Sequence, residues 1–213
     1  MRYNRKLVAA YKRLLPNWAE HILAECEGAT SIMDIGCGPN SVIQFSPCKF
    51  RMGIDIYQPY LDAAFLKHTH DIYVQGDITK LAAKPKNPKS FDVVLASEVL
   101  EHLDKHDGLA LLARMEQWAI HKVIIKVPNG YIAQPAFDGN QYQAHRSAWY
   151  EDELKELGYT VTGMSGWKPL RGTRGAARIW PYFIGDRISD MTQPLVLHRP
   201  RFAFQLFGVK HIS

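Results

Sequence analysis

The sequence predicts an α/β fold with a doubly wound, mostly parallel sheet of seven strands. Short apolar runs alternate with amphipathic stretches, which is typical of strand–helix–strand units. The run VIIKV at 123–127 is almost continuously apolar, as expected for a strand buried on both faces of such a sheet. The chain has 213 residues and is 46% hydrophobic, so it can bury the core of one domain of this kind.

The individual elements follow from the period of the apolar residues. Strands are short runs rich in β-branched residues, whereas helical stretches carry apolar residues three or four positions apart. The predicted strands are 31–35, 50–55, 71–75, 91–96, 122–127, 159–164 and 202–209, and the predicted helices are 17–27, 58–68, 103–118 and 149–157. The lysine- and proline-rich segment 82–90 is predicted to be a solvated loop.

Cysteine usage and hydropathy indicate a reduced, cytoplasmic protein. Cys26, Cys37 and Cys48 form no CxxC pair, so no structural zinc site is expected. No run of 18 apolar residues is present, so no membrane-spanning helix is predicted. The first 18 residues are basic and amphipathic. They are interpreted as a helix packed on the domain, with a mitochondrial presequence as the alternative.

Positive charge is concentrated in the C-terminal quarter. The net charge is +5, and from residue 166 onward eight Lys and Arg residues are opposed only by Asp186 and Asp190. An anionic partner is therefore expected to contact this quarter.

Polar clusters follow each of the first five predicted strands. They are DIGCGPNS after the first strand, Asp55 at the end of the second, GDI at 76–78, SEVLEH at 97–102 and PNGY at 128–131. Doubly wound sheets bind ligands beyond the carboxyl ends of their strands. The clusters therefore predict one site at this edge, where a glycine-rich turn and the start of a following helix can approach the ligand closely.

The turn after the first strand favours a cationic cofactor over a dinucleotide. Dinucleotide sites read G-x-G-x-x-G, but Ser41 stands where a third glycine would follow Gly36 and Gly38. Asp34, just before the turn, would repel a pyrophosphate and attract a positive charge.

The segment MDIGCGPNS at 33–41 resembles motif I of the class I (Rossmann-like) S-adenosyl-L-methionine-dependent methyltransferases. GIDIYQPYLDAA (53–64) resembles motif II, VQGDITKL (74–81) the adenine-contacting segment, and FDVVLASEVLEHL (91–103) the motif after the fourth strand. The resemblance covers roughly residues 25–165. It implies a small-molecule methyltransferase that uses S-adenosyl-L-methionine, with an antiparallel last strand in the sheet.

The resemblance also implies cofactor-binding roles. Asp34 would orient the turn and hold the methionine ammonium group, directly or through water. Gly36 and Gly38 would let the backbone pass close to the methionine and ribose. Asp55 would accept the ribose hydroxyls, and Ile56 would pack on the adenine.

Further along, Asp77 would accept the adenine amino hydrogens, and Ile78 would cover the ring. Ser97 and Glu98 would line the methionine end near the sulfonium. Asn40 replaces the usual glycine of the family, and asparagine tolerates the left-handed conformation better than most residues. Taken singly, Asp55 and Asp77 can also be read as helix N-caps.

Two histidines are the candidate catalytic residues. Methyl transfer relies mainly on alignment, and a general base helps when the acceptor is a hydroxyl. His102 follows the fourth strand, and His145 lies in an HRSAW segment that resembles the substrate-facing loop of small-molecule methyltransferases. His102 and His106 form an i, i+4 pair, but no third ligand stands nearby, so no metal site is expected. The HTH segment at 68–70 is predicted to be a solvated helix end.

The candidate substrate residues lie in the second half of the chain. Ordinary loop packing is the alternative for the first four of them. Nucleic acid is not expected as the substrate, because no N/D/S-P-P-Y/F motif and no Pro-Cys nucleophile is present. The candidates are Asn129, Tyr131, Tyr142, Trp149, Arg171 and Arg174.

The connection 165–201 is longer than the short turn that the family has between its last two strands. Arg171 and Arg174 in it are predicted to clamp a carboxylate or phosphate. Residues 179–197 are apolar and aromatic, which leaves open a lid over the acceptor, a homodimer surface, a peripheral membrane contact or packing on the core.

The sequence thus predicts one domain, with N-terminal helices (1–28), a cofactor-binding core (29–164), the insertion (165–201) and a final strand (202–213). The predicted function is methyl transfer from S-adenosyl-L-methionine to a small-molecule acceptor, at oxygen, with an anionic or amphiphilic acceptor favoured. The alternatives are a cofactor-binding protein without turnover and an RNA methyltransferase.

Overall fold

The computed structural model describes residues 18–80 and 88–212, apart from the side chain of Arg174. The predicted helical segment before residue 18 and most of the predicted loop 82–90 lie outside the described residues.

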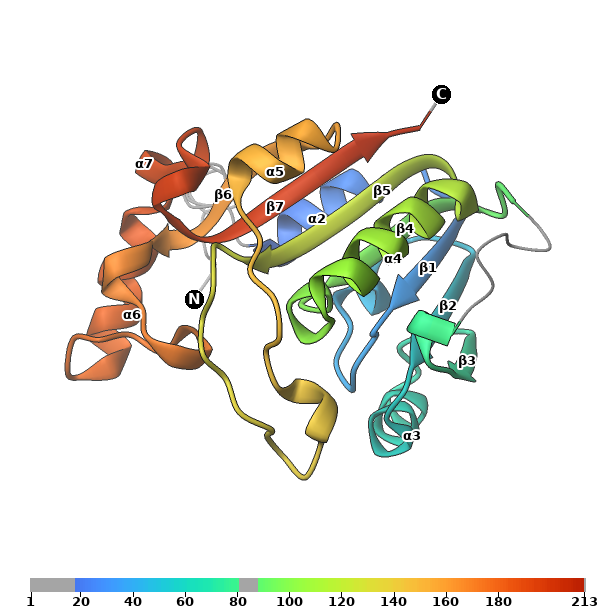
Figure 1. Cartoon of the computed structure of the whole chain (residues 1–213). Helices are drawn as coiled ribbons and strands as arrows, with labels where there is room; N and C mark the ends of the chain where they lie inside the picture. Colours follow the sequence, from blue (N-terminus) through green and yellow to red (C-terminus); the bar gives the residue numbers. More distant parts are fainter. Residues whose placement is uncertain (1–17, 81–87, 213) are drawn as a thin grey trace, which may run out of the picture.

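Seven strands form one sheet in the order β3–β2–β1–β4–β5–β7–β6 (Figure 1). The last strand, β7, runs antiparallel to both β5 and β6, and the other neighbouring strands are parallel. The predicted fold class is therefore confirmed, and the predicted strand ends differ from the observed ones by no more than three residues. The strands are β1 (Ser31–Ile35), β2 (Phe50–Asp55), β3 (Ile72–Gln75), β4 (Phe91–Ser97), β5 (Ala119–Pro128), β6 (Thr160–Trp167) and β7 (Ala203–His211).

Helices cover both faces of the sheet. Side chains of α4 and α5 pack into one hydrophobic cluster with the sheet, and α2 and α7 contribute to the cluster on the other face. The four predicted helices are present, and the insertion adds two more. The helices are α2 (Trp18–Glu25), α3 (Gln58–Leu66), α4 (Lys105–Trp118), α5 (Glu151–Glu156), α6 (Tyr182–Met191) and α7 (Gln193–Leu197).

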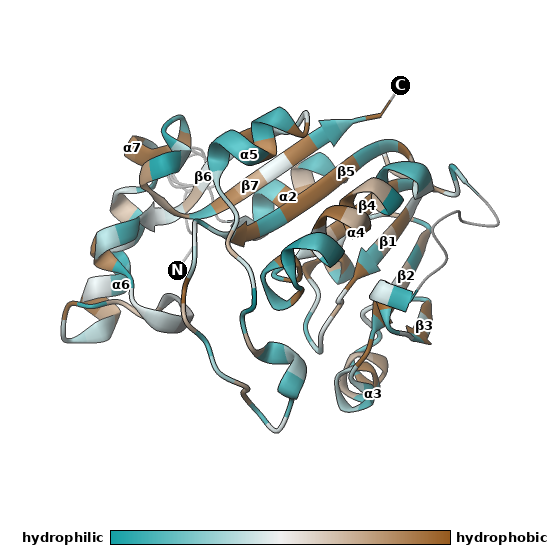
Figure 2. Cartoon of the chain, viewed as in Figure 1, coloured by the Kyte–Doolittle hydropathy of each residue, from teal (hydrophilic) through white to brown (hydrophobic). Residues whose placement is uncertain are grey.

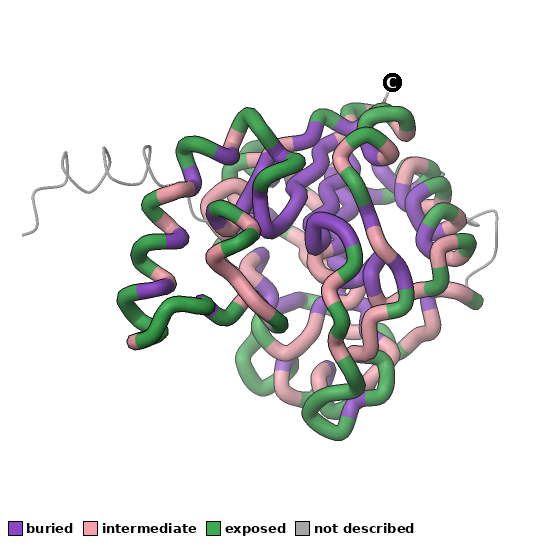
Figure 3. The backbone as a smooth tube through the Cα atoms, turned by 60° about the vertical axis from the view of Figure 1, so that its left-hand side comes forward, coloured by how far each residue is buried: buried purple, intermediate pink, exposed green. Residues whose placement is uncertain are grey.

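The central strands are apolar on both sides because both sides are covered. In β4, Val94 and Ala96 enter the cluster under α4, whereas Val93 and Leu95 enter the cluster under α2. This is the two-residue alternation of a strand, with each side chain removed from water. Figure 2 shows β4 and β5 largely in brown, and Figure 3 shows the middle of the sheet buried while the outer connections are exposed.

The insertion between β6 and β7 packs on the end of β6 through glycines. A Cβ at Gly163 would lie 2.2 Å from the carbonyl oxygen of Val196, and one at Gly166 would lie 2.2 Å from that of Ser189. The absence of these side chains lets α6 and α7 approach the strand closely. The outer side of α6 stays exposed and carries large apolar side chains, including Tyr182, Phe183 and Met191.

Among residues 18–80 and 88–212, no helix is both long and apolar enough to cross a bilayer. The predicted cytoplasmic location stays a prediction.

Candidate active site

A cavity of about 780 Å³ opens at the carboxyl ends of the first five strands. The order of the strands reverses between β1 and β4, which is where doubly wound sheets bind their ligands. The volume lies in the upper part of the range of about 300–1,000 Å³ for small-molecule sites, so the cavity has room for a cofactor and a second small molecule. All nine predicted cofactor residues border it. Asp34, Asp55 and Ser97 do so from within their strands, and the other six do so just after a strand.

The glycine turn after β1 has the backbone conformation that glycine favours. Gly36 has φ +63° and Gly38 has φ +57°. A Cβ at Gly36 would meet Cγ2 of Val99 at 2.4 Å, whereas a Cβ at Gly38 would meet nothing within 4 Å. The expected helix after the turn is reduced to one 3₁₀ turn, Val42–Phe45, whose N-cap Ser41 accepts a hydrogen bond from the backbone N–H of Ile43 at 3.4 Å.

Asp34 stabilises this turn through a hydrogen bond from Ser41. Its buried Oδ2 accepts a hydrogen bond from Oγ of Ser41 at 2.5 Å and lies 3.2 Å from Nε2 of His70. The prediction of a solvated helix end at 68–70 holds for His68, which is exposed, but it is wrong for Thr69 and His70. Both are buried, and Oγ1 of Thr69 lies 2.8 Å from Nδ1 of His70. Gly53 in the middle of β2 makes room for the imidazole, since a Cβ there would lie 2.9 Å from its Cγ. A glycine in the interior of a strand was the signal for a side chain packed across it.

Asp55 joins the turn to the end of β2. Its Oδ2 accepts the N–H of Gly38 at 2.9 Å, and its Oδ1 accepts the N–H of Tyr57 at 2.9 Å. Burial raises the pKa of Asp55, and the hydrogen bonds from Tyr57 and Gly38 act in the opposite direction. The carboxylate therefore fixes the turn while it borders the cavity.

Asp77 lies just after β3. It borders the cavity, and its Oδ1 accepts hydrogen bonds from the backbone N–H of Thr79 at 3.0 Å and from the Thr79 hydroxyl at 2.6 Å. The side-chain bond from Thr79 is the main cause that lowers the pKa of Asp77. Ile56 and Ile78 provide apolar surface on the same part of the wall.

At the end of β4, Ser97 and Glu98 border the cavity in an unusual backbone geometry. Glu98 has φ +58°, a conformation that side-chain-bearing residues seldom adopt and that often marks functional sites. Its Oε1 accepts hydrogen bonds from Nζ of Lys126 at 2.7 Å and Nε2 of Gln205 at 2.8 Å. The conformation is thus held by β5 and β7.

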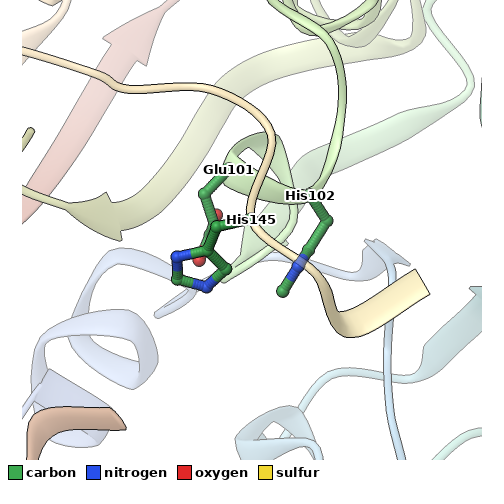
Figure 4. A group of neighbouring side chains, drawn as sticks. All are labelled: Glu101, His102 and His145. Carbon is green, nitrogen blue, oxygen red and sulfur yellow. The ribbon is translucent and has the colours of Figure 1, made fainter. Parts of the chain in front are cut away.

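Next to Glu98, three side chains converge although they come from two separate segments (Figure 4). One ligand-type atom from each of Glu101, His102 and His145 lies within 4.8 Å of the others. The rings of His102 and His145 meet edge to face, with their centroids 4.9 Å apart. Both histidines border the cavity, whereas His106, the other member of the predicted i, i+4 pair, has a fully solvated side chain.

The loop that delivers His145 is tied to the segment after β4. The backbone N–H of Arg146 donates to the carbonyl of Glu101 at 2.7 Å, and Oγ of Ser147 donates to that of Leu100 at 2.9 Å. Burial lowers the pKa of His102, with a further contribution from His145, and burial also lowers the pKa of His145. Both rings are therefore neutral at neutral pH.

Glu101 is a carboxylic acid in an apolar setting. It is buried, and its pKa is raised well above the usual range, first by burial and then by the negative charge of Glu98. Neither carboxyl oxygen of Glu101 has a hydrogen-bond partner among the residues that the structure describes.

The predicted substrate residues divide into two groups. Tyr142 and Arg171 border the cavity. The Arg171 guanidinium, however, already bonds within the protein. It donates from Nε to the carbonyl of Ser165 at 2.6 Å and from Nη2 to Asp190 at 2.9 Å, and these bonds stabilise the insertion. The Arg174 side chain lies outside the described part of the chain.

The other three predicted substrate residues do not border the cavity. The Asn129 amide is buried and donates to the carbonyls of Pro200, Arg201 and Ala203, so it fastens the end of β5 to the start of β7. Trp149 is fully buried in the core beneath Nζ of Lys105, which lies 3.5 Å from its ring centroid. Tyr131 is exposed and donates to the carbonyl of His145 at 3.4 Å.

Sequence reasoning missed several residues of the cavity wall. They share no motif. Phe204 lies in β7, and the others lie between β5 and α5, where only the HRSAW segment, which contains Arg146, could have pointed to them. The missed residues are Ile132, Gln134, Phe137, Gln143, Arg146 and Phe204.

Residues 33–121 match the model of a family described as a methyltransferase domain. One curated relative is malonyl-[acyl-carrier protein] O-methyltransferase of Halalkalibacterium halodurans, 26% identical over 136 residues, which are 60% of this chain and 46% of that protein. The chain thus aligns with less than half the length of this relative.

Solved structures share the fold at low identity. A SAM-dependent methyltransferase from Archaeoglobus fulgidus is 17% identical with a TM-score of 0.56, covering 96% of this chain and 99% of that one. Magnesium protoporphyrin IX methyltransferase from Synechocystis PCC 6803 with bound SAM is 13% identical with a TM-score of 0.51, covering 100% and 86%. The methyltransferase domain of a bacterial Hen1 protein is 16% identical with a TM-score of 0.58, covering 94% and 99%.

Proposed function

Because residues 33–121 form a methyltransferase domain within a class I, S-adenosyl-L-methionine-dependent fold, we propose that the protein transfers the methyl group of this cofactor to an oxygen atom of a small-molecule acceptor. The predicted family, enzyme class and cofactor are confirmed by the domain match and the fold. The acceptor and the methylated atom are the proposal.

The cofactor lies, in this proposal, across the ends of β1, β2 and β3. Asp55 already accepts one N–H on each oxygen, and a carboxylate has about four lone-pair positions, so two remain for the ribose hydroxyls. Asp77 receives the adenine amino group, and Ile56 and Ile78 cover the ring. Asp34 acts mainly through the turn, because its Oδ2 is already held by Ser41 and His70.

One observation supports oxygen as the methylated atom: two neutral imidazoles border the cavity beside Ser97 and Glu98. An alcohol is a weak nucleophile and gains from a neutral nitrogen that accepts its hydrogen bond and takes its proton. In the reaction the acceptor oxygen attacks the methyl carbon, and the carbon–sulfur bond breaks with its electron pair going to sulfur. The hydroxyl proton is released, and S-adenosylhomocysteine and the methyl ether are the products.

The shape of the acceptor side supports a small molecule. Phe137, Tyr142 and Phe204 give the cavity wall flat apolar surface. Arg146 adds a positive charge that suits an anionic group, although its Nη1 lies 3.9 Å from the carboxylate of Asp104. The curated relative is named as an O-methyltransferase, which also favours oxygen.

RNA as the acceptor is the second candidate, because a small RNA methyltransferase is among the proteins of similar fold and the C-terminal quarter is basic. Part of that charge is, however, neutralised within the protein. Arg171 pairs with Asp186 and Asp190, and Lys210 pairs with Glu116. This weakens the case for a phosphate-binding surface.

Transfer of a labelled methyl group tests the proposal. The protein is incubated with S-adenosyl-L-methionine carrying a labelled methyl group and with separated small-molecule and RNA fractions of a cell extract. Alkali-stable label in a compound of the small-molecule fraction is the expected result. Label in RNA alone would replace this acceptor class with the second candidate, and heat of S-adenosylhomocysteine binding without any transfer would indicate a binding protein.

A further inference from the structure

Glu101 is the residue that the proposed function leaves unexplained. Its side chain is buried, and both carboxyl oxygens lack a hydrogen-bond partner among the described residues. Burying an unpaired carboxyl group is costly, and such groups are usually found with a cation or a hydrogen-bond donor. Glu98 is close enough to raise the pKa of Glu101 by its negative charge, so a bound cation would satisfy the ionised carboxyl group.

The two histidines next to Glu101 are oriented as metal ligands are. Nδ1 of His145 lies 2.7 Å from the carbonyl of Ile132, and Nδ1 of His102 lies 3.3 Å from the carbonyl of Ala144. A carbonyl only accepts hydrogen bonds, so each Nδ1 carries the proton and each Nε2 keeps a free lone pair. A backbone carbonyl on the other ring nitrogen is the usual outer support of a metal-bound imidazole.

We propose that Glu101, His102 and His145 bind one divalent transition-metal cation at the acceptor side of the cavity. Binding itself does not depend on the proposed function, whereas the role of the cation in methyl transfer rests on it. Two imidazoles and one carboxylate form a frequent ligand set of catalytic metal sites, which keep an open position for water or substrate.

The geometry requires only small adjustments. Three ligands at about 2.0–2.2 Å from one ion lie roughly 3.4 Å apart in a tetrahedral arrangement. The three atoms here are all within 4.8 Å of one another, so changes of the order of 1 Å in side-chain position complete the site. Figure 4 shows the carboxyl group of Glu101 behind the ring of His145, with His102 to the right of both.

The charges around the group also suit a cation. Glu98 adds a second negative charge close to Glu101, and Lys126 is the buried positive charge that pairs with Glu98. Once a metal ion displaces the proton of Glu101, one lysine stands against two carboxylates. The acidic and imidazole groups named at this point are Glu98, Glu101, His102 and His145, and their negative charge attracts a divalent cation.

In methyl transfer the cation would bind the acceptor oxygen in its open position. A metal ion lowers the pKa of a bound hydroxyl, so the proton leaves to solvent and the oxygen attacks as an alkoxide. The methyl carbon–sulfur bond then breaks as described above. With the metal bound, the two histidines would be ligands, and the metal would replace them as the group that activates the acceptor hydroxyl.

Calorimetry on the metal-stripped full chain tests binding directly. Zn²⁺, Mn²⁺ and Mg²⁺ are titrated separately, and zinc content is measured by mass spectrometry after dialysis. We expect one Zn²⁺ or Mn²⁺ per chain, binding more tightly than Mg²⁺. Loss of an outer-shell partner typically costs 10–100-fold in metal affinity, so Glu101→Gln, His102→Asn and His145→Asn should each cost at least about 100-fold.

The matched control is His106→Ala, because His106 is one helical turn from His102 and its side chain is solvated. It should leave the stoichiometry and affinity unchanged. The inference is overturned if no divalent ion binds with 1:1 stoichiometry, if Mg²⁺ binds best, or if the three variants bind the metal as tightly as the His106 variant does.

Titration with S-adenosylhomocysteine separates this inference from the proposed function. The Glu101→Gln variant should retain a folded thermal transition and bind S-adenosylhomocysteine within a few-fold of the parent chain. Cofactor binding without metal binding would overturn only the metal site. Metal binding without cofactor binding or turnover would overturn only the proposed function.

Discussion

The two sides of the cavity are built in different ways. On the cofactor side, each predicted residue sits at the end of a strand, and Asp34, Asp55 and Asp77 bond to backbone or hydroxyl groups within the same turn or the neighbouring one. On the acceptor side, His145 and its neighbours come from a long loop held by distant partners such as the carbonyl of Glu101. The first side is specified locally, and the second depends on the packed core.

This difference shows which changes each side tolerates. The cofactor side should respond to substitutions that alter a turn and leave the core intact. The acceptor side should respond to substitutions in the core that lie well away from the ligand. Four experiments test this contrast, in order of decreasing effect.

The largest effect is expected at Trp149, which anchors the acceptor loop. The side chain is fully buried above Gly108, where a Cβ would lie 2.5 Å from Cζ2 of the indole. Trp149→Ala should lower the free energy of unfolding by about 3–5 kcal/mol, measured by urea denaturation. Trp180→Ala, at a side chain that is 80% exposed, should change it by less than about 0.5 kcal/mol. Equal effects of the two would show that the loop is not anchored by the core.

A smaller loss is expected at Gly36 on the cofactor side. Alanine there adds the cost of a left-handed backbone to a clash with Val99, about 2–4 kcal/mol together, and should abolish S-adenosylhomocysteine binding in calorimetry. Gly38→Ala meets no atom within 4 Å and should cost only about 1–2 kcal/mol. If the two variants lost equal stability, the contact with Val99 would not matter.

Asp55→Asn should weaken S-adenosylhomocysteine binding more than it weakens the fold. Loss of the charge removes hydrogen bonds worth about 1.5–3 kcal/mol each, so calorimetry should show a decrease of about 10–100-fold. Asp62→Asn, on the exposed side of α3, is the control and should bind as the parent does. An unchanged affinity in the Asp55 variant would remove this residue from the cofactor site.

The smallest effect is a pH dependence at Asp77. Its pKa is lowered in the folded protein, chiefly by the Thr79 hydroxyl, so its contribution is present above the unfolded pKa and is lost as the pH falls through the folded one. Because the Asp77 side chain is only partly buried, solvent screening should keep the contribution below about 1 kcal/mol. Urea denaturation between pH 7 and pH 3 should show a shallower acid loss for Thr79→Val than for the parent. An identical pH profile would contradict the assignment.

The sequence was informative where function is carried by strand ends. Each of the first apolar runs is followed by acidic, polar or glycine residues. This pattern was enough to identify β1, β2, β3 and β4 and the edge of the sheet at which their carboxyl ends lie. The reason is that the carboxyl ends of parallel strands meet at one edge whatever the loops do.

It failed where side chains pack across the sheet or arrive on loops. His70 was predicted to lie at a solvated helix end, although the absence of a side chain at Gly53 makes room for its ring in the interior. The sequence paired His102 with His106 and offered no third ligand nearby, whereas the structure brings His145 to His102 across 43 positions of chain through hydrogen bonds from Arg146 and Ser147. Contacts of this kind produce no regular spacing of residues in the sequence, so a pattern-based prediction cannot find them.

Glycines at the positions of Gly163 and Gly166 in a related sequence should predict where its inserted helices pack. The helices α6 and α7 pack on β6 so closely that their carbonyl oxygens occupy the space where side chains at these two positions would lie. Any larger residue at either position would therefore push α6 and α7 away from the strand. A homologue with a long connection but without this small-residue pair should place its extra helices elsewhere. The two glycines could therefore separate relatives whose insertion packs on β6 from relatives whose insertion packs elsewhere.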